Sequence, residues 1–275
     1  GVFGMQKKTV RLVEGAVMVA FAVILSLLKI LELPYGGSVT VCSMLPILII
    51  AYRHGVGFGS FTALVYGVVQ MLLGMKNVLY FTTPLSIAAV IILDYILAFA
   101  ALGLGGAFRK VIRRQAAALE LGTLLACFVR YICHVISGCT VWAGLSIPSA
   151  DALLYSLAYN ATYMIPETIV TLLGAALIGR VLDFRHDTVT RLTDESRTLN
   201  VPAILGGVAV VGALIFDVCE VFAKLQDAET GNFLITGLAD VRWGAVGIVS
   251  AICFIFAVFC FFVFSPKKDL QSKNK

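Results

Sequence analysis

Long apolar stretches alternate with short polar segments along almost the whole chain. The hydrocarbon core of a bilayer is about 30 Å thick, so a helix that rises roughly 1.5 Å per residue needs about 20 mainly apolar residues to cross it. That template fits about eight times, near residues 10–31, 38–53, 56–74, 84–106, 116–140, 149–180, 202–223 and 243–264. The pattern predicts an all-α, polytopic membrane helical bundle.

Two features of this pattern predict how the bundle is organised. The sixth stretch is longer than a bilayer requires, so we expect it to tilt, to extend past the membrane or to bend, with Pro166 as the expected kink. A polar segment separates six stretches from a final pair. We therefore predict a six-helix core in 1–182, a charged cytoplasmic linker in 183–200, and an appended transmembrane hairpin with a basic cytoplasmic tail in 201–275.

The composition predicts that the chain resides in a membrane, and the distribution of charge predicts which side each loop faces. Hydrophobic residues make up 60% of the 275 residues and charged residues 13%, whereas soluble domains contain about 25% charged residues. Lysine and arginine gather before the first predicted helix, after the second, fourth and sixth, and behind the last. Because cytoplasmic loops retain basic residues, we expect both termini to be cytoplasmic.

The sequence lacks the motifs that would indicate an enzyme or a metal centre. It contains no GxxxxGK[ST] phosphate loop, no HExxH and no CxxC, so we expect neither ATP hydrolysis by that loop nor a zinc site. His134 and Ser137 share a helical turn, but no surrounding motif supports an intramembrane serine protease. No basic run carries the interleaved aromatic residues of a nucleic-acid surface. We therefore expect a non-enzymatic protein without cofactor, metal or nucleic acid.

Three polar side chains interrupt the apolar stretches at similar depths. A charge at the centre of a bilayer costs about 2.5–3.5 kcal/mol on insertion scales, so such residues are candidates for function. Counted from the outer ends of their helices at helical rise, Asp94 lies about 15 Å deep, His134 about 12 Å and Asn160 about 16 Å. We therefore expect these residues to meet in the outer half of the bundle.

Aromatic residues surround these three positions. Tyr95 directly follows the carboxylate, and Trp142 lies two turns above the histidine. Tyr155 begins a series of tyrosines at i+4 spacing on the sixth predicted helix. A carboxylate among aromatic rings suits a small organic cation through charge pairing and cation–π attraction, while His, Asn and Tyr side chains can bond the edge of a heterocycle. The pattern predicts a binding pocket that faces outward.

Each candidate also has a structural interpretation that the sequence leaves open. Trp142 and Tyr155 lie near predicted membrane boundaries, where aromatic residues commonly serve as anchors. Asp94 is consistent with a buried ion pair to Arg130 that locks two helices, a network that the nearby histidine would complete. Asn160 is consistent with interhelical hydrogen bonding. In that interpretation the chain is a structural or regulatory membrane protein and not a transporter.

Five sequence blocks follow one another on the predicted helices. They read LPYGGSVT at 33–40, MLPILIIAYRHGVGFG at 44–59, LDYILAFAALGLGG at 93–106, RYICHVISG at 130–138 and YSLAYN at 155–160. As an ordered series they resemble the S components of energy-coupling-factor (ECF) vitamin transporters, and within them the thiamine-specific type. The resemblance extends from residue 10 to about residue 182.

The resemblance implies a six-helix S-component core in a prokaryotic cell membrane. It further implies that this core binds thiamine from outside and associates with a transmembrane coupling protein and two ATPase subunits. By matching positions, the residues that would bind thiamine are Asp94, Tyr95, His134, Trp142, Tyr155 and Asn160, with Tyr35 on a lid loop after the first helix. Ala16 and Ala20 match the family's AxxxA pattern for docking the coupling protein. The pattern has a physical reason, since small residues four apart let two helices approach closely.

Two departures from the family pattern bear on function. Asp94 stands where the family usually holds glutamate, so the charge is kept on a side chain that is one methylene shorter. The two predicted helices after residue 200 are extra to the six-helix core. An S component for another vitamin or for a thiamine precursor therefore stays open as an alternative.

Overall fold

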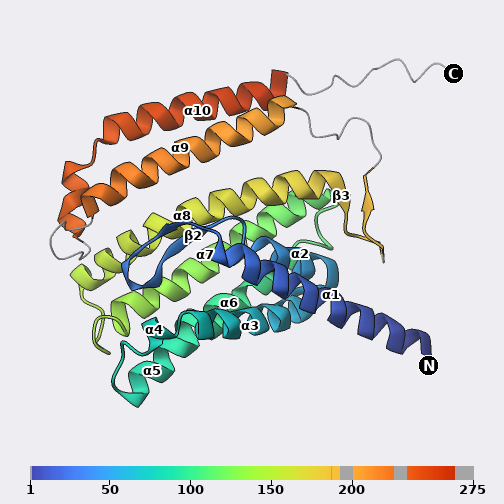
Figure 1. Cartoon of the computed structure of the whole chain (residues 1–275), viewed down its shortest axis with the longest axis horizontal. Helices are drawn as coiled ribbons and strands as arrows, with labels where there is room; N and C mark the ends of the chain where they lie inside the picture. Colours follow the sequence, from blue (N-terminus) through green and yellow to red (C-terminus); the bar gives the residue numbers. More distant parts are fainter. Residues whose placement is uncertain (1, 187, 193–200, 226–233, 264–275) are drawn as a thin grey trace.

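Helices make up almost all of the computed structural model, which describes residues 2–186, 188–192, 201–225 and 234–263 (Figure 1). Within these residues, seven helical stretches have the length and apolar composition to cross a membrane. They are α1 (Val2–Leu27), α3 (Val56–Leu73), the run from α5 to η3 (Pro84–Gly106), α7 (Gln115–Thr140), α8 (Ala150–Val181), α9 (Val201–Leu225) and α10 (Trp243–Val263). The predicted all-α membrane bundle is confirmed, and α8 continues through Pro166 as one helix.

The second predicted helix is shorter than expected, and a β-hairpin replaces its start. α2 (Leu45–His54) has ten residues, which span about 15 Å at helical rise, or half a membrane crossing. Upstream of it, β1 (Lys29–Glu32) pairs antiparallel with β2 (Ser38–Thr40). The predictions of helix over 28–31 and 38–44 were therefore wrong. We call residues 29–40 the outer hairpin.

The turn of the outer hairpin explains why the helical pattern fails here. η1 (Pro34–Gly36) makes the turn, in which Tyr35 and Gly36 have φ angles of 67° and 98°. A proline removes a backbone donor, and a positive φ is incompatible with a continuing α-helix. Apolar residues flank the turn on both sides, so hydropathy alone does not distinguish these strands from helix.

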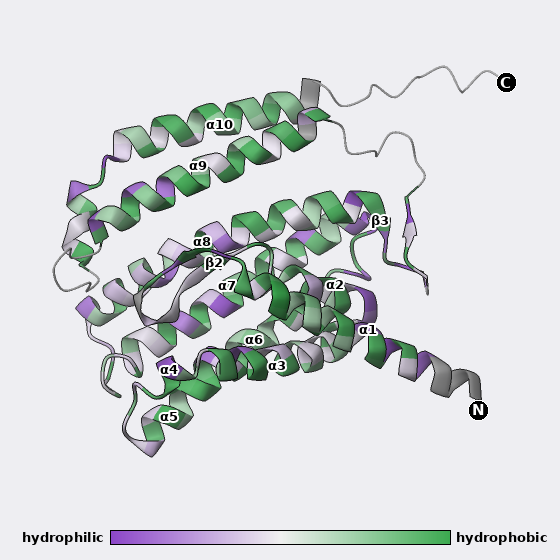
Figure 2. Cartoon of the chain, in the orientation of Figure 1, coloured by the Kyte–Doolittle hydropathy of each residue, from purple (hydrophilic) through white to green (hydrophobic). Residues whose placement is uncertain are grey.

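The helix α2 lies at the centre of the bundle and not against lipid. Every residue from Leu45 to Tyr52 is buried, in a core that also includes Leu102 of η3 and Leu119 of α7. The longer helices, by contrast, keep many large apolar side chains exposed on the surface of the chain. Apolar residues cover most of the length of α10 (Figure 2). This is the distribution expected of a bundle with lipid around it.

The fourth predicted helix is helical throughout but changes its winding. It consists of α5 (Pro84–Val90), a π-helical segment η2 (Ile91–Leu97), α6 (Ala98–Ala100) and the 3-10 segment η3 (Ala101–Gly106). Such π-helical turns are rare and often occur at functional sites. Here the π-helical segment contains Asp94 and Tyr95.

The last two helices form an antiparallel pair beside α8 (Figure 1). Two polar contacts hold the pair together: Ser250 donates to Asp217, and Arg242 forms two hydrogen bonds with Glu220 at 2.8 and 2.6 Å. The start of α1 and the end of α10 point to the same end of the molecule. The remaining short elements are α4 (Met75–Val78), β3 (Leu182–Asp183), β4 (Thr190–Arg191) and η5 (Ile235–Asp240).

Candidate ligand-binding site

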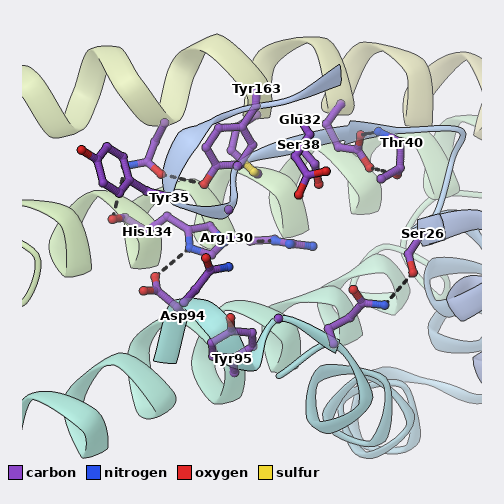
Figure 3. Close-up of a pocket in the computed structure, with 18 of the residues that line it drawn as sticks. Ser26, Glu32, Tyr35, Ser38, Thr40, Asp94, Tyr95, Arg130, His134 and Tyr163 are labelled. Carbon is purple, nitrogen blue, oxygen red and sulfur yellow. Dashed lines mark hydrogen bonds and ion pairs between the residues drawn. The ribbon is translucent and has the colours of Figure 1, made fainter. Parts of the chain in front are cut away.

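A cavity of about 550 Å³ lies between the outer hairpin, α3, η2, α7 and α8 (Figure 3). Ser43, which lies just before α2 begins, is part of its floor. Because α2 is short, it leaves room above its N-terminus, and this room is the cavity that the outer hairpin covers. All seven residues proposed for ligand binding line this cavity: Tyr35, Asp94, Tyr95, His134, Trp142, Tyr155 and Asn160. The structure therefore brings the polar residues of the three predicted helices to one cavity.

Asp94 is the centre of the polar network in the cavity. Its Oδ1 lies 2.8 Å from His134 Nδ1, and its Oδ2 accepts hydrogen bonds from Ser137 Oγ at 2.7 Å and from Trp142 Nε1 at 3.2 Å. The side chain is 14% exposed. Three donors from α7 and its C-terminal turn thus fix the carboxylate at the cavity wall.

Arg130 determines the hydrogen position on His134. Its Nε lies 3.3 Å from His134 Nε2, and a guanidinium can only donate, so this ring nitrogen accepts. The other ring nitrogen then carries the hydrogen and donates to Asp94, which makes the histidine neutral. Among the described residues, the three groups that donate to Asp94 are therefore uncharged.

The predicted alternative of a direct ion pair between Asp94 and Arg130 is not the arrangement observed. The guanidinium instead lies over the ring of Phe99, 4.3 Å from its centroid, and reaches the carboxylate only through His134. None of the three groups that donate to Asp94 is a cation in this arrangement, so a ligand can supply the positive partner of the carboxylate. The geometry is thus suited to a cationic ligand.

Aromatic rings form the outer wall of the cavity. Trp142 stacks on Tyr80 with ring centroids 5.7 Å apart, and Tyr35 meets the Trp142 ring edge-on at 6.0 Å. Tyr155 and Tyr159 stack with centroids 6.4 Å apart. Trp142 and Tyr155 therefore line the cavity as well as lying near a helix end, and Tyr80 is a wall residue that the sequence analysis missed.

Asn160 both lines the cavity and links two helices. Its Nδ2 donates to the carbonyl oxygens of Ser156 at 2.9 Å and His134 at 3.4 Å, and its Oδ1 accepts from the Tyr163 hydroxyl at 2.7 Å. The interhelical interpretation of this residue thus has contacts to support it.

Glu167 is a second buried acid at the inner end of the cavity. Its Oε2 accepts from the Thr40 backbone N–H at 2.5 Å, and its Oε1 accepts from the Thr40 hydroxyl at 2.6 Å. These bonds tie the base of the outer hairpin to α8 (Figure 3). The sequence analysis missed this residue, although an acid inside an apolar helix was the criterion that selected Asp94.

The proposed docking residues lie away from the cavity. Ala16 and Ala20 are exposed on α1, one helical turn apart, and neither lines the cavity. Between them and the bundle, Gly15 is buried against Phe58 of α3. The small-residue face of α1 is therefore open to a neighbour in the membrane.

Comparison with known proteins identifies relatives of the first two thirds of the chain. The family model of the thiamine transporter protein (Thia_YuaJ) matches residues 12–183. Thiamine transporter ThiT of Bacillus subtilis is 38% identical over 183 residues, which cover 62% of this chain and 91% of that protein. Thiamine transporter ThiT of Lacticaseibacillus paracasei is 26% identical over 190 residues, or 62% of this chain and 88% of that protein.

A solved structure has the same fold. ThiT from Listeria monocytogenes superposes with a TM-score of 0.52 at 23% identity, covering 63% of this chain and 95% of that one. The residues that match the family model end at 183, before the start of α9 at Val201. The matched region thus contains the whole cavity wall and leaves out α9 and α10.

Proposed function

The chain belongs to the thiamine transporter protein family, and on this premise we propose that the cavity beneath the outer hairpin binds thiamine for uptake. It is a multi-pass membrane protein of a transporter family and not an enzyme. We expect the cavity to open to the outside and both termini to lie in the cytoplasm, as the basic residues at the opposite ends of the helices favour.

The observation that carries the proposal is the carboxylate of Asp94 held by neutral donors beside aromatic rings. Thiamine has a cationic thiazolium ring and an aminopyrimidine ring. The carboxylate pairs with the positive charge of the thiazolium ring, and the thiamine rings stack on the faces of Trp142 and His134. Tyr155 and Asn160 bond polar edges of the ligand, Tyr95 helps to shape the wall, and Tyr35 closes the cavity from the outer hairpin.

Uptake requires an energy source that this chain lacks in its sequence, since no phosphate-binding loop is present. We propose that the protein serves as the S component of an ECF transporter, with a coupling protein and two ATPase subunits as partners. The exposed Ala16 and Ala20 face on α1 is the proposed contact with the coupling protein. Ala16→Trp should then abolish co-purification with that module without affecting thiamine binding.

A fluorescence titration tests binding directly. The chain has two tryptophans, so the Trp243→Phe variant leaves Trp142 as the reporter in the cavity wall. We expect saturable, equimolar quenching by thiamine without ATP. An isosteric analogue with carbon in place of the charged thiazolium nitrogen should bind far more weakly. No saturable quenching by thiamine would overturn the proposal, and tighter binding of a thiamine precursor in the same assay would favour the alternative ligand.

A further inference from the structure

The appended pair α9 and α10 lies outside the family match but contacts the element that covers the cavity. Phe222, near the end of α9, packs against a buried cluster made by the outer hairpin and α8. The cluster consists of Leu33, Val39, Tyr163 and Met164. A helix without a counterpart in the matched region therefore packs against the cluster that joins the cover of the ligand cavity to α8.

A second observation places the outer hairpin beside α9. A small apolar cavity of about 40 Å³ is lined by Ile30, Leu31 and Val39 of the hairpin and by five side chains of α9. These are Val211, Leu214, Ile215, Val218 and Cys219. Leu31, Leu214 and Val218 also line an apolar cavity of about 720 Å³ between α8, α9 and α10, so the apolar surfaces of the hairpin and α9 face each other with space left between them.

Side chains alternate along a strand, so the two faces of the outer hairpin contact different parts of the molecule. Leu31 pairs with Val39 on the face toward α9. Glu32 pairs with Ser38 on the other face, and both line the ligand cavity. Each movement of the hairpin away from the cavity therefore also disturbs the contact with α9.

The cavity face of the hairpin is held at both ends by α8. At the base, Glu167 accepts two hydrogen bonds from Thr40; at the tip, the Gly37 N–H donates to the Tyr159 hydroxyl at 3.2 Å. The apolar residues of the hairpin, Leu31 included, pack with Tyr163 and Met164 of α8, and Phe222 of α9 packs against the same cluster. Opening of the hairpin would therefore separate groups against which Phe222 packs.

We propose that α9 braces the outer hairpin in its closed position over the cavity, with Phe222 as the main positioning residue. The inference rests on the proposed function, since it concerns release of the ligand bound there. Loss of the brace allows the hairpin to open more often, so bound thiamine escapes faster while the cavity wall itself is unchanged. The appended pair thus sets the residence time of the ligand.

The test measures release of radiolabelled thiamine from the purified full chain after addition of excess unlabelled thiamine. Phe222→Ala should accelerate release on the order of tenfold, the effect expected of truncating a partly buried phenylalanine. Its fraction of binding-competent protein should equal that of the unaltered chain, and Phe222→Leu should restore slow release. Phe256→Ala is the matched control, since Phe256 is 45% exposed on α10 and lines none of the described cavities.

A second readout works without any ligand. Hydrogen exchange of the amides in residues 29–40 should be faster in Phe222→Ala than in Phe256→Ala, and Leu31→Ala should reproduce the effect from the opposite surface. Unchanged exchange and unchanged release in Phe222→Ala would overturn the brace. Faster exchange in a chain that binds no thiamine would support the brace and overturn the proposed function instead.

Discussion

Asp94 combines a negative charge with neutral hydrogen-bond donors, and this combination predicts how ligand affinity responds to substitution. Asp94→Asn keeps the size of the side chain but removes the negative charge that pairs with the thiazolium ring. Loss of one partner of a buried charge pair costs about 2–5 kcal/mol, so thiamine affinity should fall by roughly two to three orders of magnitude. Isothermal titration calorimetry measures the change.

Asp94→Glu is the matched control for charge, because it moves the carboxylate by one methylene and keeps its ionisable group. Because the negative charge is kept, Asp94→Glu should lose much less affinity than Asp94→Asn. Equal affinity of Asp94→Asn and the unaltered protein, together with a lowered unfolding temperature, would instead indicate a structural role for the carboxylate.

The helices α7 and η3 approach each other so closely that only glycine fits between them. A Cβ added at Gly122 would collide with the backbone carbonyl of Gly105, which no side-chain rotation can relieve. Gly122→Ala should therefore destabilise the folded protein by about 1–3 kcal/mol. Thermal unfolding in detergent measures the shift.

Gly207 on α9 provides the comparison. A Cβ there meets nothing within 4 Å, so Gly207→Ala should leave stability unchanged or raise it by about 0.5–1 kcal/mol. Equal effects of the two alanine substitutions would show that α7 and η3 tolerate a wider separation than their contact suggests.

The segment after α8 contains a carboxylate whose pKa predicts an acid-dependent contact. Hydrogen bonds from the Arg185 guanidinium to Asp183 lower the pKa of this carboxyl to about 2. A folded-state pKa below the unfolded value means that the ionised group stabilises the fold above pH about 4, and that this contribution is lost as pH falls toward 2. Asp183→Asn should be less stable than the unaltered chain at neutral pH.

Unfolding measured between neutral pH and pH 2 tests this sign. The difference between Asp183→Asn and the unaltered chain should shrink across the acid range and vanish near its lower limit. Gln115 fixes the same segment without a charge, through bonds to Leu182 and Phe184. Gln115→Ala should therefore lower stability by a similar amount at every pH, and a constant difference for Asp183→Asn would contradict the assignment.

The division of the chain into a core and an appended pair predicts that the core is sufficient for binding. The match to Bacillus subtilis ThiT takes up 91% of that protein but only 62% of this chain. A chain that ends at residue 192 keeps every residue that lines the cavity. It should bind thiamine with equimolar stoichiometry and release it roughly tenfold faster, as loss of the α9 contacts requires.

Equilibrium binding and release of the shortened chain measure the two parts of this prediction. A folded but binding-incompetent core would show that α9 and α10 belong to the functional unit. Release at the rate of the full chain would show that the outer hairpin closes without their help.

Hydropathy along the chain was enough to predict most of the architecture. A bilayer requires each crossing segment to be apolar over its own length and to satisfy its own backbone hydrogen bonds. Residence in the membrane and the seven long helices therefore follow from local sequence. The depths of Asp94, His134 and Asn160 are local quantities too, since each is counted along a single helix, and the structure brings the three around one cavity.

Tertiary contacts decided the structure between the long helices and the partners of each polar side chain. Residues 28–31 and 38–44 carry the same apolar signal as a helix, and the turn at Tyr35, together with pairing between β1 and β2, makes residues 29–40 the outer hairpin before a shortened α2. The partner of Asp94 is His134 and not Arg130, because partners across helices depend on how each helix is rotated against its neighbours. Glu167 bonds that hairpin and Phe222 packs against the cluster that the hairpin forms with α8. Hydropathy describes one segment at a time and carries no information about such contacts.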